Sequence, residues 1–549
     1  MNVTSQIPFP SNLITTVTGY YSDSKLKSEG HGSVFTTLAI VWFSVVLIGS
    51  PTLKWIQQRW KAWGYLFGGP AMIQEAFAKA NGKPFEVVSQ ETRHIFISSP
   101  TEIKQLLSSP SEDLSFYAAA RYLAQPQYTM HNFNWLDHEG VTAMGKAKSE
   151  GGGFTKAVRV CLTNNLSRVL PSLGHIVEKE VEAMLHEHKI VDGVRQSPIH
   201  EMITRLVVLC NIRAIFGAEL ATNETFVKAA QAYIEQTILG SEAIRIMPHW
   251  FQPVIGRIVP RWMTAQHVVY ATLLPIVQER LKERELPLAE QPQHADCIQW
   301  VIDCSTSLVQ QKGQSSGIGA ERAVHELMAI WFGSVHAVAA VVTFAIEDLC
   351  LHQEYIAPLR QEIDAQFEGF KRAGQPSGLP LLDSFIKESA RLAPNEALST
   401  RRAALKPLSF TDSSNKTWHL AKGDWLCTPL WALNMSDQIY TNPEKFDGFR
   451  FVPSEVLKAI SESSPKTKPA QSKPGKIYDT DYEWLMFGIG KQACPGRFYA
   501  TATFKLIIAT IVRKYDLRMV KPGVKRWWTM ESALVPREVG IVFTEREDR

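Results

Sequence analysis

A single cysteine near the C-terminus, Cys494, stands in a stretch whose composition suits a reactive or metal-binding thiol. The stretch reads FGIGKQACPGRFYA. Its three glycines, Gly488, Gly490 and Gly496, let a backbone bend or approach another group closely. Pro495 suits the first turn of a helix, which would place Cys494 at the helix cap, where the helix dipole favours a thiolate. Taken alone, the pattern also fits a buried structural cysteine in a turn.

Charged residues upstream add a second pattern. In LLDSFIKESARLAPNEALSTRR, Glu388 and Arg391 are three residues apart and share one face of a predicted helix. Alone, they indicate no more than a solvated ion pair. The stretch NPEKFDGFRFVP then supplies Arg450, which could bridge that pair. The chain thus contains, in order, Glu-x-x-Arg, Pro-x-x-Phe-x-x-x-Arg-Phe and Phe-x-x-Gly-x-x-x-Cys-x-Gly.

This ordered series resembles the cytochrome P-450 family of haem-thiolate monooxygenases, and the similarity runs from about Gly69 to the C-terminus. The resemblance implies that Cys494 is the axial thiolate of a haem b iron. An anionic sulfur ligand pushes electron density to the iron and favours O–O cleavage. The stretches GKPFEVV, LDSFIKES and CPGRFYA are similar to microsomal enzymes of filamentous-fungal specialised metabolism. A more distant likeness is to the sterol 7α-hydroxylase and prostacyclin synthase branch.

The resemblance also assigns supporting roles to other residues. It implies that the loop residues Phe487, Gly490 and Gly496 lie beneath the porphyrin. It makes Glu388, Arg391 and Arg450 a structural triad that locks this loop to the core. Haem propionates are anionic and need cationic partners. The positions implied for those partners are Lys491, Arg401 (or Arg402) and Arg159, although Thr155 stands where related chains often have histidine beside Arg159.

One segment departs from the family pattern. In GSVHAV, Gly333 and Ser334 occupy the small positions, His336 replaces an acid and Ala337 replaces a threonine. That threonine helps the family to organise water for proton delivery, and Ala337 has no hydroxyl. His336 could relay protons, because the unperturbed pKa of histidine is about 6.5. It could equally be a hydrogen-bonded core residue, and the Ser334 hydroxyl is a further candidate for the proton route.

Composition narrows the class of protein. The chain has 549 residues, of which 45% are hydrophobic and 20% charged, as in a globular protein. The net charge of +4 is small and gives no reason to expect a nucleic-acid partner. The seven cysteines are odd in number and lack CxxC spacing, which argues for reduced thiols rather than a disulfide scaffold or a zinc site.

The N-terminal region predicts a membrane anchor. Residues 33–50, SVFTTLAIVWFSVVLIGS, carry no charge and are about long enough to cross a bilayer. Lys and Arg residues follow, which indicates a cytosolic side for what comes after. We therefore expect a lumenal tail (1–32), a single-pass anchor in the endoplasmic reticulum membrane (33–50) and a linker (51–68). A buried core helix is the alternative for 33–50, and Asn2 begins a glycosylation sequon of unknown use.

The remainder, 69–549, reads as one haem-thiolate monooxygenase domain, mainly α with a minor β portion. FEVVSQETRHIFISS predicts a β-hairpin. The apolar run from Glu321 to His352 predicts one long buried helix. PLSFTDSSNKTWHLAKGDWLCTPL predicts strands joined by polar turns. The Ser-, Lys- and Pro-rich segment at about 458–481 predicts a surface insertion with little fixed structure.

The resulting interpretation is a haem-dependent monooxygenase that oxidises an apolar specialised metabolite of terpenoid, meroterpenoid or alkaloid type. NADPH supplies electrons through a flavoprotein reductase, and cytochrome b5 is a further candidate partner. The substrate pocket is expected to be lined by small or apolar residues, Gly333, Ala337, Ala397 and Leu398. Two alternatives stay open: a haem-thiolate rearrangement or dehydration enzyme without a reductase, and a non-enzymatic membrane haem or ligand-binding protein.

Overall fold

The computed structural model describes residues 53–546 except 90–91, 134–152, 189, 192–193, 248, 288, 312–317, 462–472, 522–526, 530–531 and 538. The predicted tail and anchor, 1–50, lie outside the described residues. The chain divides into two compact units, Met1–Lys61 and Ala62–Arg549. Helix α3, Leu53–Ala80, begins before that boundary, so the segment expected as a linker is helical from Leu53. The fold described below is that of the second unit.

Helices dominate the second unit, as the apolar periodicity predicts, and their starts follow sequence signals. Ser99 caps α4 through a hydrogen bond from the Glu102 N–H, and Asn223 caps α11 in the same way. The longer helices are α4 (Pro100–Ser108), α5 (Phe116–Ala124), α8 (Leu166–Glu187), α9 (Ile199–Ile215), α11 (Glu224–Arg245), α13 (Ala265–Glu283), α14 (Cys297–Gln311), α15 (Ala320–Ser334), α16 (His336–Leu351), α17 (Ile356–Ala373), α18 (Pro380–Leu392) and α21 (Arg497–Lys514). The shorter ones are α6 (Pro126–Thr129), α7 (Gly153–Lys156), the π-helix η2 (Ala157–Leu162), α10 (Ala218–Ala221), α12 (Gln252–Ile258), α19 (Leu430–Asn434), α20 (Ser454–Ser461) and the 3₁₀ turns η3 (Val259–Trp262), η4 (Gln353–Tyr355) and η5 (Gly490–Gln492).

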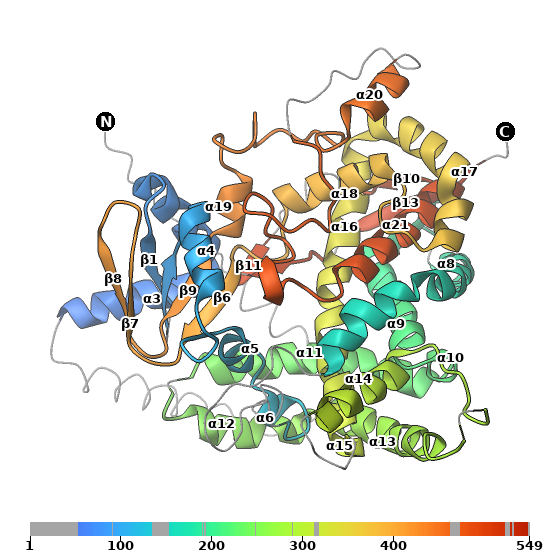
Figure 1. The fold of residues 1–549 in the computed structure, drawn as a ribbon. Coiled ribbons are helices and arrows are strands. Elements are labelled where there is room, and N and C mark those ends of the chain that lie inside the picture. Colours follow the sequence, from blue (N-terminus) through green and yellow to red (C-terminus); the bar gives the residue numbers. More distant parts are fainter. Residues whose placement is uncertain are drawn as a thin grey trace, which may run out of the picture. The chain divides into compact units, whose positions relative to one another are not determined.

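The main β-sheet pairs strands from the start of the domain with strands from residues 399–428. The predicted hairpin is present, since β1 (Phe85–Val88) pairs antiparallel with β2 (Arg93–Phe96). These strands belong to a five-stranded sheet of order β1-β2-β9-β6-β3, completed by β9 (Trp425–Thr428), β6 (Ser399–Ala404) and β3 (Leu114–Ser115). Figure 1 shows the blue early strand β1 beside the orange later strands β9 and β6. Strand β9, together with the ribbon β7–β8 (Leu408–Thr411 and Thr417–Leu420), confirms the strands predicted in this region.

The other strands form smaller sheets. A four-stranded sheet of order β10-β13-β5-β4 comprises β10 (Tyr515–Met519), β13 (Gly540–Glu545), β5 (Val194–Pro198) and β4 (Ile190–Val191). Two separate ribbons pair β7 (Leu408–Thr411) with β8 (Thr417–Leu420), and β11 (Trp527–Thr529) with β12 (Ser532–Leu534).

The long apolar helix predicted over 321–352 is two helices. Helix α15 ends at Ser334 and α16 begins at His336, with Val335 between them at φ −102° and ψ −59°. The run Ala320–Leu351 is the one stretch among the described residues that is long and apolar enough to cross a membrane, but most of it is buried inside the fold. Helix α16 packs against α9, α18 and α21, so it is the central helix of the core.

The described downstream part of the expected insertion makes fixed contacts with the core. Residues 462–472 lie outside that portion. Downstream, Ile477 is fully buried, and its N–H donates to Asp383 Oδ2 at 2.9 Å. The Trp484 indole donates to the Ile477 carbonyl at 2.8 Å. The prediction of little fixed structure is therefore wrong for 473–481, because one apolar side chain and its backbone fasten this part to α18.

Candidate functional site

The loop before Cys494 has the tight backbone that its glycines predict. The Cys494 N–H donates to the Phe487 carbonyl at 2.7 Å, which closes the loop. Gly488 and Gly490 have φ values of +67° and +71°, a region that residues with a Cβ rarely adopt. Helix α21 begins at Arg497 with Gly496 as its N-cap. Pro495 and Cys494 therefore precede the helix, and the prediction of a cysteine at the cap itself is off by two residues.

The electrostatics of Cys494 are mixed. Burial raises the pKa of its thiol above the ordinary value. The N–H groups of Gly496 and Arg497 and the positive charges of Arg497 and Arg159 act in the opposite direction but are outweighed. The helix start favours the thiolate, as expected, but its effect on the pKa is smaller than that of burial. A coordinating metal would deprotonate the thiol outright, so the protein need supply only a partly buried sulfur beside two cations.

Two arginine side chains donate hydrogen bonds to backbone carbonyls of the cysteine loop. Arg159 of η2 donates through Nη2 to the carbonyls of Lys491, at 2.8 Å, and Ala493, at 3.3 Å. Arg497 donates through Nη1 to the Cys494 carbonyl at 3.1 Å. The Nε atoms of Arg159 and Arg497 are buried without a hydrogen-bond partner among the described residues. Buried donors of this kind are normally satisfied, so both fit an anionic group bound beside the loop.

The predicted pair on β6 splits into two roles. Arg401 forms an ion pair with Glu396 and lies over the Trp425 ring. Arg402 is buried, and its Nη1 donates to the Arg401 carbonyl at 2.9 Å. Burial lowers the pKa of Arg402 to about 10, and no carboxylate of the described residues pairs with it. Arg402 is thus the stronger candidate of the two for a bound carboxylate, whereas the Lys491 residue is exposed.

The break between α15 and α16 opens a space inside the helical core. Gly333 is exposed there, and a Cβ added to it would meet nothing within 4 Å. Ser334, His336 and Ala337 are partly exposed, while Trp331 before them and Val338 after them are buried. Four of the predicted distal residues therefore lie together at an opening of the core.

The chemical groups at this break are few. Burial lowers the pKa of His336 below its ordinary value, so a neutral imidazole predominates near pH 7. His200 of α9 lies nearby, and its pKa is lowered to about 4, first by burial and then by the charge of His336. The Ser334 hydroxyl donates to the Trp331 carbonyl at 2.9 Å and is engaged within its own helix.

The predicted pocket residues Ala397 and Leu398 lie elsewhere. Each is 1% exposed and belongs to an apolar cluster with Phe96 and Trp425. They pack the sheet core, so the expectation that they line an open pocket is wrong. Small and apolar composition indicated burial correctly, but it could not tell a pocket wall from a packed core.

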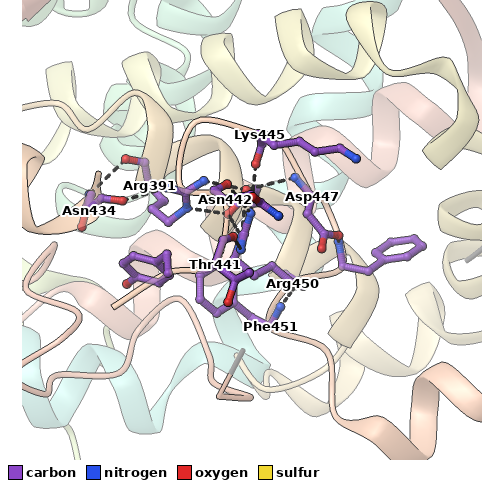
Figure 2. A network of polar contacts seen from close by, with 12 residues as sticks. Arg391, Asn434, Thr441, Asn442, Lys445, Asp447, Arg450 and Phe451 are labelled. Carbon is purple, nitrogen blue, oxygen red and sulfur yellow. Dashed lines mark hydrogen bonds and ion pairs between the residues drawn. The ribbon is translucent and has the colours of Figure 1, made fainter. Parts of the chain in front are cut away.

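Glu388, Arg391 and Arg450 lie together in the core. Arg391 donates from Nε and Nη2 to the two Glu388 oxygens, each at 2.8 Å. Arg450 Nε lies 3.1 Å from both oxygens. All three side chains are at most 4% exposed, so this is no solvated ion pair. Figure 2 shows Arg391 and Arg450 converging at the centre of this network.

The same network fixes the loop at 441–447, and none of its contacts among the described residues reaches the cysteine loop at 487–496 that it was expected to lock. Arg450 donates to the carbonyls of Thr441, at 2.8 Å, and Lys445, at 2.9 Å. The Asp447 N–H donates to Glu388 Oε1 at 3.0 Å. Three carbonyl and amide groups of one loop are thus satisfied by two buried side chains (Figure 2).

Two residues at the site were not foreseen. Arg497 was overlooked, although its place three residues after Cys494 gave a usable signal. Asn211 donates to the Ser334 carbonyl at 2.8 Å and is fully buried in α9. Its signal was a lone amide within the apolar run VVLCNIRAIF.

Comparison with known proteins gives the class of this fold and site. The Cytochrome P450 family model matches residues 51–542. Cytochrome P450 monooxygenase 151 of Postia placenta is 25% identical over 87% of this chain and 89% of its own length. Cytochrome P450 monooxygenase BOA4 of Botryotinia fuckeliana is 29% identical over 70% and 73%, and paxP of Penicillium paxilli is 27% identical over 82% and 80%. The cyanobacterial CYP120A1 structure, bound to retinoic acid, shares the fold with a TM-score of 0.59 at 16% identity, covering 88% of this chain and 97% of its own.

The chain belongs to the cytochrome P450 family. It is a monooxygenase-type enzyme, and the non-enzymatic alternative is set aside. The family uses haem iron as its cofactor, with electrons from NADPH through a reductase. The residues present fit that group: a partly buried thiol, two arginines with unsatisfied buried Nε donors, and an open space beside Gly333.

Proposed function

We propose that this protein is a membrane-anchored monooxygenase that oxidises an apolar specialised metabolite of terpenoid, meroterpenoid or alkaloid type. The observation that carries the proposal is the opening at the α15–α16 break, which exposes Gly333 within an apolar core. An apolar substrate would gain by filling it, because burial removes apolar surface from water. The similarity to fungal monooxygenases supports a biosynthetic oxidase.

The haem, when bound, supplies dioxygen activation and electron transfer. Cys494 would bind its iron through sulfur, in a loop closed by the Phe487–Cys494 hydrogen bond. Three arginines would neutralise its propionates. Arg159 and Arg497 each have a buried Nε without a hydrogen-bond partner among the described residues. Arg402, on β6, is buried and has no carboxylate partner among those residues. Glu388, Arg391 and Arg450 hold the preceding loop in place.

On the other side, His336 is proposed to move protons into the opening. The Ala337 methyl offers no hydroxyl, and the Ser334 hydroxyl is occupied by the Trp331 carbonyl. A neutral imidazole can accept a proton at one nitrogen and donate from the other. His336 therefore offers the most direct route among the described residues of this segment.

The absent hydroxyl also favours a second candidate. A rearrangement or dehydration of an oxygenated substrate needs no proton delivery to dioxygen, and so would suit Ala337. The two candidates differ in their need for electrons. Co-expression with a reductase, feeding of candidate scaffolds and product analysis with and without NADPH would decide: turnover without NADPH or reductase would overturn the monooxygenase proposal.

The proposal extends to location and organisation. Residues 33–50 would anchor the chain in the endoplasmic reticulum membrane, with 1–32 lumenal and the haem domain, from about residue 69, cytosolic. Partners would be a flavoprotein NADPH reductase and cytochrome b5.

A further inference from the structure

The end of α15 leaves the Ser334 carbonyl at a position without a donor from its own helix. The last four carbonyls of an α-helix have no intrahelical partner. Here the Asn211 side chain supplies one, with Nδ2 donating to Ser334 O at 2.8 Å. In a continuous helix the same carbonyl would accept from the Val338 N–H. The Asn211 amide therefore stands in for a backbone group that the break displaces.

Asn211 is itself held by a third helix. Its side chain is 0% exposed, and Oδ1 accepts a hydrogen bond from the Tyr499 hydroxyl at 2.8 Å. Tyr499 lies in the first turn of α21, which starts three residues after Cys494, and is itself buried. Two hydrogen bonds thus link the beginning of α21, through α9, to the break between α15 and α16.

We propose that Asn211 is a positioning residue that selects the bent form of the α15–α16 segment and so sets where His336 and Ala337 stand at the opening. This inference rests on the proposed function for its catalytic consequence. Helices bend sharply at Gly/Ser pairs and where a side chain enters the i→i−4 ladder, and Gly333-Ser334 meets Asn211 at this point. Tyr499 orients the amide, because a hydroxyl donating to Oδ1 leaves Nδ2 to face Ser334.

The alternative form is specific. Without the amide, the part-buried Ser334 carbonyl loses its donor from α9, and an unmade hydrogen bond costs free energy. The segment recovers that bond if α15 and α16 join into one helix, with the N–H groups of residues 336–338 bonded to carbonyls one turn earlier. Those N–H groups would then become protected, whereas a general loosening of the core would expose them.

Amide hydrogen exchange on full-length, haem-loaded protein in detergent separates these cases. In Asn211→Leu, which keeps a similar volume, we expect exchange at residues 336–338 to slow by roughly tenfold. Tyr499→Phe should change it in the same direction by less. Thr510→Val is the matched control: it also removes one buried hydroxyl from α21, where Thr510 donates to the Leu506 carbonyl at 2.8 Å, and should leave 336–338 unchanged.

Unchanged or faster exchange at 336–338 in both variants would overturn the proposal, since Asn211 would then only fill the core. If Asn211→Leu fails to take up haem, Tyr499→Phe carries the test alone. With reductase and a substrate, the slowed variant should release more peroxide per NADPH than the parent. The exchange measurement needs no turnover, so an inactive parent would refute the proposed function and leave this inference standing.

Discussion

Arg450 Nε lies 3.1 Å from both carboxylate oxygens of Glu388, the same two oxygens that Arg391 contacts at 2.8 Å. One buried carboxylate thus holds two guanidinium groups, of which Arg391 is fully buried and Arg450 is 4% exposed. Such an arrangement is stable only as a whole, because removal of one member leaves a buried charge without compensation.

Glu388→Ala should therefore prevent folding around haem rather than slow turnover. Leaving Arg391 and Arg450 uncompensated is expected to cost about 3–5 kcal/mol. The measurement is haem content per soluble protein. Glu75→Ala, which breaks an exposed pair with Lys79, should leave haem content unchanged. A haem-replete but slow Glu388→Ala protein would show that the residue acts in catalysis instead.

Cys494→Ser should abolish activity and the long-wavelength Soret band that the reduced carbon monoxide complex shows with thiolate ligation. A neutral alcohol is a poor axial donor in place of sulfur. Cys350→Ser, at the far end of α16, is the control and should keep the band. Persistence of the band in Cys494→Ser would exclude this cysteine as the ligand.

Deletion of residues 1–50 should release much of the protein from microsomal membranes, because it removes the long uncharged run 33–50. The fraction left in the pellet after carbonate washing measures attachment. Full-length protein that is already soluble after this wash would contradict the anchor.

His336→Ala should lower the product formed per NADPH and raise peroxide release, with substrate affinity nearly unchanged. A positioned general acid contributes about 10²–10⁴-fold, which bounds the loss. His419→Ala, on the exposed ribbon β7–β8, is the control. Coupling equal to that of the parent would make His336 a core residue, with water or substrate carrying the protons.

Ala337→Thr tests proton delivery by adding a hydroxyl group. It restores a hydroxyl where the chain lacks one, and should improve coupling if the space before Gly333 extends to this side chain. Substrate binding that is lost without any change in haem content would show that the pocket has no room.

Glu362 should make stability depend on pH. Its carboxylate accepts the N–H groups of Leu381, at 2.7 Å, and Leu382, at 3.0 Å, at the start of α18. Burial raises its pKa from 4.5 to about 7. Because the folded state binds the proton more tightly, this contribution is complete below about pH 4.5 and is lost as the pH rises through 7, by on the order of 3 kcal/mol.

Glu362→Gln should remove that dependence. The midpoint of thermal haem loss, followed from pH 5 to 8, should fall more steeply in the parent than in Glu362→Gln. Parallel curves would mean that Glu362 is ionised in the fold at neutral pH.

The sequence carried the loop around Cys494 and the Glu388–Arg391–Arg450 contact well, because both depend on short spacings and on residue types with few structural uses. It failed where the outcome depends on long-range packing. Ala397 and Leu398 belong to a core cluster with Phe96 and Trp425, which come from strands distant in the sequence, so no local pattern reveals their burial. The break at Val335 is similar: Gly333-Ser334 permits it, but the donor that satisfies it, Asn211, comes from 123 residues earlier in the chain.

The α15–α16 segment also affects how the chain folds during synthesis. Ala320–Leu351 has the length and apolarity of a membrane span, and α9, which covers part of it, is synthesised before it. Its other covers, α18 and α21, are synthesised only afterwards. A nascent or truncated chain that ends after Leu351 therefore presents an apolar helix that α9 covers only in part. Fragments of this kind should aggregate or bind to membranes, and correct folding depends on α18 and α21 being synthesised to cover the rest of the helix.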